Sequence, residues 1–147
     1  MEVNYLAVLV AALVNMALGA LWYSPALFGK QWMAIMGYTP EMMKNPDMKK
    51  KANKGYFISF VGALVMYYVL AHVMKSMIAF MAQAGSEPVS AVHAGLMGGF
   101  WMWLGFVAVV TLDSVLWEGK PWKFWLINNS YRLVTLLIGG VILAVWM

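Results

Sequence analysis

The ionisable side chains in or beside the long apolar runs are the first residues to consider for chemistry. His72 and Lys75 would share one face of a helix, and Glu87 and His93 follow further along the chain. Two imidazoles and a carboxylate are groups that bind metal ions or relay protons. Because their spacing matches no dedicated metal motif, we interpret both histidines as interfacial groups that hydrogen-bond to backbone or lipid. The sequence predicts no metal and no cofactor.

A second set of polar residues surrounds the end of the third apolar run and the start of the fourth. Asp113 ends the third run, and Arg132 lies in the first turns of the fourth. We expect an ion pair between them, because either charge alone would be uncompensated if water were excluded. The alternative is an anion or lipid-headgroup site. Its residues would be Lys30, Lys120, Asn128, Asn129 and Arg132, with Asp113 orienting them.

Asn15 lies roughly midway through the first apolar run. An unpaired amide in lipid is costly, so we expect Asn15 to face another helix and to hydrogen-bond there. Lining a pathway is the alternative role. The chain has no cysteine, no nucleotide-binding glycine loop and no serine- or zinc-hydrolase motif. The sequence therefore offers no catalytic residue, and an enzyme is the weakest of the functional classes.

The composition indicates whether these side chains are surrounded by water or by lipid. Of 147 residues, 63% are hydrophobic and only 11% are charged, whereas a soluble domain has about 25% charged residues. Four apolar runs reach the length of about 20 residues that a helix needs to cross a bilayer, and helix is expected because backbone groups in lipid must pair within the segment. We predict an all-α integral membrane protein with one domain, residues 1–147. The predicted spans are residues 3–23, 56–81, 92–112 and 126–146.

The basic residues predict the orientation. Eight of the ten lysines and arginines lie in two connectors, residues 24–55 and 113–125. The positive-inside rule places both connectors in the cytoplasm and both termini outside. We interpret the net charge of +4 as favouring contact with anionic headgroups of the cytoplasmic leaflet. We expect no nucleic-acid partner.

The first connector is long enough to contain structure of its own. Residues 25–36 mix large apolar side chains with one cation, which predicts a short interfacial helix. Thr39-Pro40-Glu41 predicts the start of a second short helix, and Asn45-Pro46-Asp47 predicts its end. We interpret the lysines at 49–51 as a solvated segment that faces headgroups, and a specific lipid site is the less favoured alternative.

Two sequence elements recur in the same order. Gly29-Lys30-Gln31-Trp32 follows the first run and Gly119-Lys120-Pro121-Trp122 follows the third, while Asn53-Lys54-Gly55-Tyr56 and Asn128-Asn129-Ser130-Tyr131 open the second and fourth. This pattern favours a parallel tandem repeat of a two-helix unit, residues 1–82 and 90–147, over chance matches.

Small residues spaced four apart predict close contacts between helices, within the chain or between copies of it. There are three such stripes, namely Ala91, Gly95 and Gly99; Gly55, Ser59 and Ala63; and Thr135 and Gly139.

The longest distinctive string runs from residue 19 to residue 32 and contains Trp22-Tyr23-Ser24-Pro25, Leu27-Phe28-Gly29-Lys30 and Trp32. Together with residues 4–13, 118–121 and 128–131, it resembles a family of small bacterial membrane proteins, domain of unknown function 1761. The resemblance implies a four-helix protein of the bacterial inner membrane. It brings no catalytic residue and no substrate.

Three functions compete. Few ionisable groups and many small-residue stripes favour a non-enzymatic protein that forms a homo-oligomer or accompanies a larger membrane complex. The second hypothesis is a small transporter or channel with a pathway between the two repeat units, which Asn15, Asp113 and Arg132 in one wet cavity would support. The third, a lipid-binding or lipid-modifying protein at the cytoplasmic interface, lacks an evident nucleophile.

Overall fold

The structure, a computed structural model, describes residues 2–146, and the regular elements in this part of the chain are all helical. Four helices are long and apolar enough to cross a membrane. They are α1 (Tyr5–Trp22), α4 (Pro46–Gln83), the continuous helix Ala91–Leu116 that begins with α5 (Ala91–Trp103), and α7 (Trp122–Val145). The predicted all-α architecture with four candidate membrane spans is confirmed.

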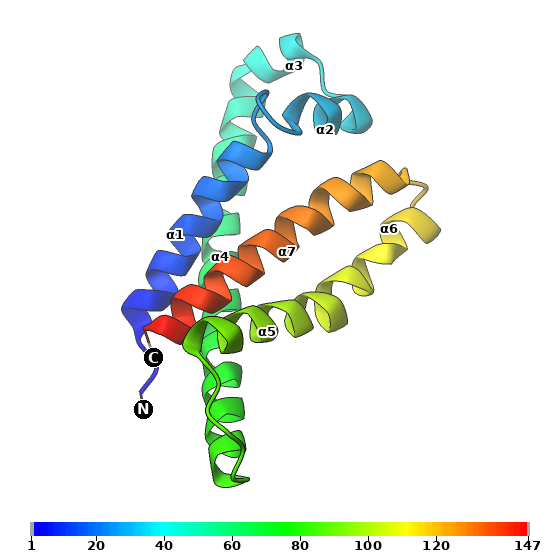
Figure 1. The fold of residues 1–147 in the computed structure, drawn as a ribbon. Helices are drawn as coiled ribbons and strands as arrows, with labels where there is room; N and C mark the ends of the chain where they lie inside the picture. Colours follow the sequence, from blue (N-terminus) through cyan, green and yellow to red (C-terminus); the bar gives the residue numbers. More distant parts are fainter. Residues whose placement is uncertain (1, 147) are drawn as a thin grey trace.

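α7 is the central helix of the bundle (Figure 1). It packs against α1, α4 and α5, and 44% of its apolar window is buried, the largest share among the four candidate spans. The two described ends of the chain lie side by side, where Asn4 Nδ2 donates a hydrogen bond to the Trp146 carbonyl at 3.3 Å. The two basic connectors lie away from these ends, the first at the top of Figure 1 and the other at its right.

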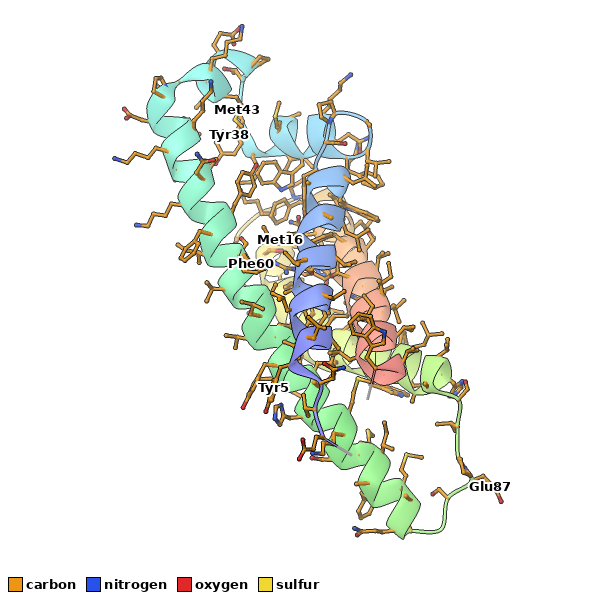
Figure 2. All side chains as sticks on the ribbon, turned by 90° about the vertical axis from the view of Figure 1, so that its left-hand side faces the viewer. Tyr5, Met16, Tyr38, Met43, Phe60 and Glu87 are labelled. Atoms are coloured by element: carbon orange, nitrogen blue, oxygen red, sulfur yellow. The ribbon has the colours of Figure 1, made fainter. Side chains whose placement is uncertain are left out.

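The first connector contains α2 (Gly29–Met36) and α3 (Pro40–Lys44). Thr39 caps α3 as the sequence predicted, and its Oγ1 accepts from Met42 N. The Asn45-Pro46-Asp47 string ends α3 but also starts α4, because Asn45 Oδ1 accepts from Asp47 N and Pro46 occupies the first helical position. α4 therefore begins ten residues before the predicted span at 56, and its first turns stand beside Tyr38 and Met43 (Figure 2).

The third span is also longer than the predicted residues 92–112. After α5 the helix widens into a π-helical turn, η1 (Leu104–Ala108), tightens at η2 (Val110–Leu112) and ends with α6 (Asp113–Leu116). Thr111 Oγ1 donates to the Val107 carbonyl at 2.7 Å. Such changes of helical pitch accompany side chains that bond back to the helix backbone.

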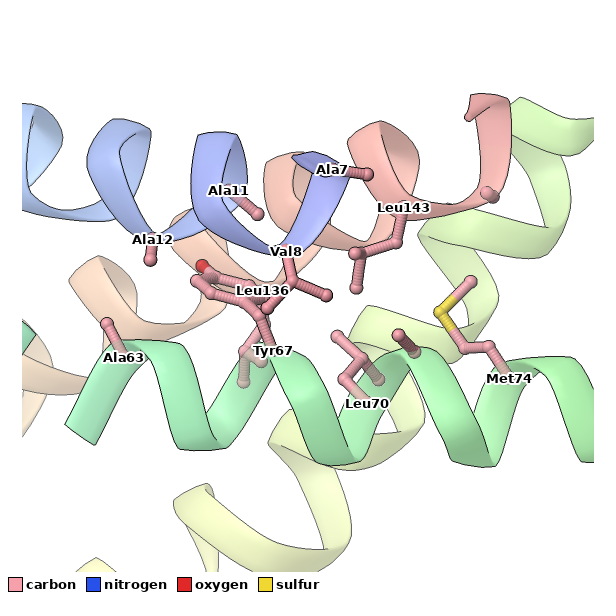
Figure 3. Packing of buried hydrophobic residues seen from close by; sticks show 12 residues of the cluster. Ala7, Val8, Ala11, Ala12, Ala63, Tyr67, Leu70, Met74, Leu136 and Leu143 are labelled. Atoms are coloured by element: carbon pink, nitrogen blue, oxygen red, sulfur yellow. The ribbon is translucent and has the colours of Figure 1, made fainter. Parts of the chain in front are cut away.

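The core lies where α1, α4 and α7 meet (Figure 3). It contains several alanines, and Tyr67, Leu70 and Leu143 are its largest fully buried apolar side chains. Ala7, Ala11 and Ala12 of α1 are fully buried. Small residues at these positions let the helix axes approach closely.

The predicted small-residue stripes differ in what they contact. On α5, a Cβ added to Gly99 would collide with the Leu136 carbonyl oxygen, and one added to Gly95 would lie 2.6 Å from the Gly140 carbonyl oxygen. This stripe packs α5 against α7, backbone to backbone. A Cβ at Gly55 would meet nothing within 4 Å, so this end of the α4 stripe makes no close helix contact within the chain.

Candidate functional site

A buried set of polar side chains joins three helices, and we name Asn15, Tyr67, Tyr131 and Thr135 the polar seam. Asn15 Nδ2 donates to Tyr131 Oη at 3.1 Å, and Tyr131 Oη donates to the backbone carbonyl of Asn15, also at 3.1 Å. Tyr67 Oη lies 2.7 Å from the Thr135 carbonyl and 3.3 Å from Asn15 Oδ1. Asn15 therefore faces α4 and α7, and both ends of its amide are paired.

Glycines make room for both tyrosines. A Cβ at Gly19 would lie 2.9 Å from Tyr131 Oη, and a Cβ at Gly139 would collide with the Tyr67 ring. Tyr67 lies on the same face of α4 as the buried Ala63 and Leu70. The seam thus depends on α1, α4 and α7 together.

A second set of hydrogen bonds closes the connector end of the bundle. Tyr23 Oη donates to Asn128 Oδ1 at 2.6 Å, and Trp22 Nε1 donates to the Ile127 carbonyl at 3.0 Å. Burial raises the pKa of Tyr23, which lies one residue beyond α1, to about 12, and the nearby Arg132 guanidinium acts in the opposite sense. The Tyr23 phenol is therefore protonated at neutral pH and available as a donor.

Asn129 links the second half of the third span, from η1 to α6, to α7 by hydrogen bonds. Its Nδ2 donates to Thr111 Oγ1 at 2.9 Å and to the Trp125 carbonyl at 3.2 Å. Trp103 Nε1 donates to the Asn129 carbonyl at 3.0 Å, whereas Trp101 is 54% exposed on the outer surface. The two tryptophans near the middle of the third span therefore have different environments.

A pocket of about 340 Å³ lies between α6 and α7 at the connector end. Asp113 and Glu118 contribute carboxylates, Asn128 and Asn129 contribute amides, and Phe124 is among the aromatic lining residues. The Lys120 ammonium group lies 5.7 Å from the centre of the Phe124 ring. Two acidic groups thus gather in an otherwise basic part of the protein.

The residues expected to hold an anion do not all meet in this pocket. Arg132 is exposed, and its guanidinium carbon lies 5.4 Å from the centre of the Tyr131 ring. Within residues 2–146, no ion pair joins Arg132 to Asp113. Lys30 is exposed in the first turn of α2, and neither it nor Arg132 lines the pocket.

The ionisable residues at the end of the bundle away from the basic connectors lie in two separate places. His72 and Lys75 line a pocket of about 320 Å³ together with Glu2, Val3 and Tyr5. His72 Nδ1 lies 2.7 Å from the Tyr68 carbonyl. His93 belongs to the first turn of α5, where its backbone N–H donates to Ser90 Oγ, and Glu87 lies on the connector before it (Figure 2). No cluster of three or more metal-binding side chains occurs among residues 2–146.

Sequence reasoning identified Asn15 but missed its partners Tyr67 and Tyr131. Every face of these helices is apolar, so periodicity does not distinguish the lipid side from the core side. A buried amide needs a donor and an acceptor, and tyrosines near the depth of Asn15 were the available signal. The partner helix could be chosen only from the tertiary structure.

Comparison with known proteins provides a family. No curated protein and no solved structure matches the chain. A family model described as "Protein of unknown function (DUF1761)" matches residues 6–144, nearly the whole chain. The match agrees with the resemblance found around Trp22-Tyr23-Ser24-Pro25, and the chain belongs to the DUF1761 family.

Proposed function

We propose that this protein is a non-enzymatic membrane subunit that works as a homo-oligomer or within a larger membrane complex. The observation that carries the proposal is the polar seam. The buried side chains of Asn15, Tyr67 and Tyr131 bond to one another and to the backbone carbonyls of Asn15 and Thr135. Groups engaged in this way stabilise helix association.

The seam also bears on the transporter hypothesis. The α1–α4 pair meets the α5–α7 pair through Tyr67, Leu136 and Leu143, which fill the region between them (Figure 3). A pathway between the two units would have to displace these side chains. A rigid scaffold needs no such rearrangement, so the packing favours the subunit hypothesis.

The outer surface supplies a candidate contact for a partner. The helix Ala91–Leu116 is the least covered span, with 17% of its apolar window buried. Phe106, in η1, is 70% exposed, and Val109, the residue after η1, is 58% exposed. We propose that this face packs against a second copy or another subunit.

Purification from native membranes at gentle detergent concentration, followed by native mass spectrometry, tests the proposal. We expect a stoichiometric oligomer or a stable complex. Phe106→Ala with Val109→Ala should lower the assembled fraction, and Leu13→Ala on the exposed face of α1 is the matched control. A monomer that catalyses solute flux in liposomes would contradict the proposal and favour transport.

We further propose that both basic connectors face the cytoplasm and both termini face outward. The support is the charge distribution, because the two connectors carry eight of the ten basic residues. The chain has no native cysteine, so single cysteines report accessibility without background. In intact cells an impermeant maleimide should label Ser86→Cys and spare Lys44→Cys, and the reverse pattern would overturn the orientation.

We propose, finally, that the two helical pairs descend from one duplicated unit. Ser24 Oγ donates to the carbonyl three residues earlier, at 2.7 Å, and Ser114 Oγ does the same at 2.8 Å. The matched glycines differ, since Gly119 has a positive φ of 71° and Gly29 starts a helix. Significant similarity between the two halves across an alignment of the family would support duplication, and its absence would refute it.

A further inference from the structure

The first turns of α4 form the most concentrated charge on the described surface. Lys49, Lys50, Lys51 and Lys54 are all exposed, with Asp47 as the acidic neighbour in the first turn. They stand on a capped helix that continues without a break into the membrane span. Their ammonium groups therefore project from a regular helical frame instead of a loose connector.

Apolar side chains continue the basic face toward the membrane. Lys50, Lys54, Phe57, Val61 and Val65 recur at spacings of three and four residues, so they follow one face of α4. Phe57, Val61 and Val65 are 69%, 42% and 58% exposed. Met48 and Ala52, on the opposite side of the first turns, are partly covered. The face is thus cationic at one end, apolar at the other and open along its length.

The dimensions of this face match one leaflet. From Lys50 to Val65 the helix advances by fifteen residue steps, a rise of about 22 Å. Half of a bilayer including its headgroups measures about 20–22 Å. The ammonium groups therefore reach headgroup level when Val65 lies near the middle of the hydrocarbon.

We propose that this face of α4 binds an anionic phospholipid, with Lys50, Lys51 and Lys54 around the phosphate and an acyl chain along Phe57, Val61 and Val65. Charge complementarity selects the headgroup, since four lysines oppose one aspartate in the first turns of α4. The apolar stripe distinguishes a lipid from a free phosphate, because only a lipid covers both ends. The proposal is independent of the subunit hypothesis and requires only that α4 span a membrane.

The test measures phosphatidylglycerol and phosphatidylcholine retained by the purified protein, using native mass spectrometry in mixed micelles. The parent should retain phosphatidylglycerol preferentially. Each lysine near an anionic surface contributes roughly a fivefold change in affinity, so the triple variant K50Q/K51Q/K54Q should bind phosphatidylglycerol at least about tenfold more weakly. The variant K30Q/K44Q/K123Q removes equal charge from exposed lysines elsewhere and should change affinity less than about twofold.

Two further arms test the acyl part of the site. Phe57→Ala should weaken retention of phosphatidylglycerol, whereas Phe80→Ala, 70% exposed near the other end of α4, should not. Glycerophosphate should not displace the lipid. Equal losses in the two triple variants would show a diffuse surface charge effect and overturn the proposal. Displacement by glycerophosphate, or equal retention of both lipids, would overturn it as well.

Discussion

α7 is attached to its neighbours by two different kinds of contact. Toward α1 and α4, Tyr131 and the Thr135 carbonyl take part in side-chain hydrogen bonds across the polar seam. Toward α5, Gly140 and the backbone near Leu136 touch the backbone of Gly95 and Gly99 directly. In lipid, apolar surfaces gain nothing by leaving the solvent, so close packing and hydrogen bonds must supply the association energy. Hydrogen-bonded side chains thus characterise the α1 and α4 side at the polar seam, and direct backbone contact characterises the α5 side at Gly95 and Gly99, with Trp103 Nε1 adding a hydrogen bond to the Asn129 carbonyl further along.

The two mechanisms tolerate change differently. Backbone contact leaves no side chain to adjust, so an added methyl group must separate the helices. A lost hydroxyl in the seam leaves space and an unpaired partner, which can find another donor or acceptor. We therefore expect the α5–α7 contact to be the more sensitive of the two.

Gly99→Ala should have the largest effect. The new Cβ would collide with the Leu136 carbonyl oxygen, which the helix backbone holds in place. Overpacking costs about 1–3 kcal/mol, measured as reduced unfolding free energy in detergent. Gly62→Ala is the matched control, because its Cβ meets nothing within 4 Å. Equal stability of the two variants would show that the close approach is unimportant.

Tyr67→Phe should have an intermediate effect. It removes the donor to the Thr135 carbonyl and to Asn15 Oδ1 while keeping the ring beside Gly139. Hydrogen bonds between membrane helices contribute about 0.6–1.7 kcal/mol, so we expect a loss of that size in the same unfolding assay. Tyr68→Phe, on the exposed side of α4, should leave stability unchanged. A loss as large as that of Gly99→Ala would reverse the ranking of the two sides.

A double-mutant cycle tests whether the two sides act separately. Asn15→Ala and Tyr131→Phe remove groups that bond to each other, so their effects on unfolding free energy should be coupled by at least about 0.5 kcal/mol. Asn15 contacts α7 at Tyr131, whereas Gly95 contacts it at Gly140, nine residues or about 14 Å further along. The effects of Asn15→Ala and Gly95→Ala on unfolding free energy should therefore be additive. Strong coupling in the second pair would mean that the bundle yields as one unit.

Tyr23→Phe should have the smallest effect. Its hydrogen bond to Asn128 lies at the connector end, where Tyr23 is half-buried and water can replace the lost partner. We expect a loss of about 0.5 kcal/mol, measured by thermal unfolding beside Tyr67→Phe. If the two variants lose equal stability, the end of the bundle contributes as much as the seam.

Local sequence signals predicted the bounds of the short helix α3. Thr39-Pro40-Glu41 predicted the start of α3 because capping depends on neighbouring residues. Asn45-Pro46-Asp47 was interpreted only as an end, although the same three residues supply an N-cap, a first-position proline and an acidic first turn. The sequence therefore contains the signal for a start of α4 at Pro46, ten residues before the predicted span.

Partners across the bundle were predicted less well. Asn15 was expected to bond to another helix, but nothing in an evenly apolar chain indicates which one. The α5 stripe of Gly95 and Gly99 packs within the chain, while Gly55 of the α4 stripe is open. The same small-residue pattern has both outcomes, because helix contact depends on rotation and crossing angle as well as on residue size.

Composition and charge by themselves determined four apolar helices and two basic connectors, because span length and hydrophobicity are local properties. The capping residue Thr39 determined where α3 starts. Tertiary structure alone decided that α7 is central, that Asn15 pairs with Tyr67 and Tyr131, and that the apolar face of α4 beside its lysines stays open. Those features depend on which helix faces meet, and in a chain apolar on all sides that choice is made by shape and by the pairing of a few buried polar groups.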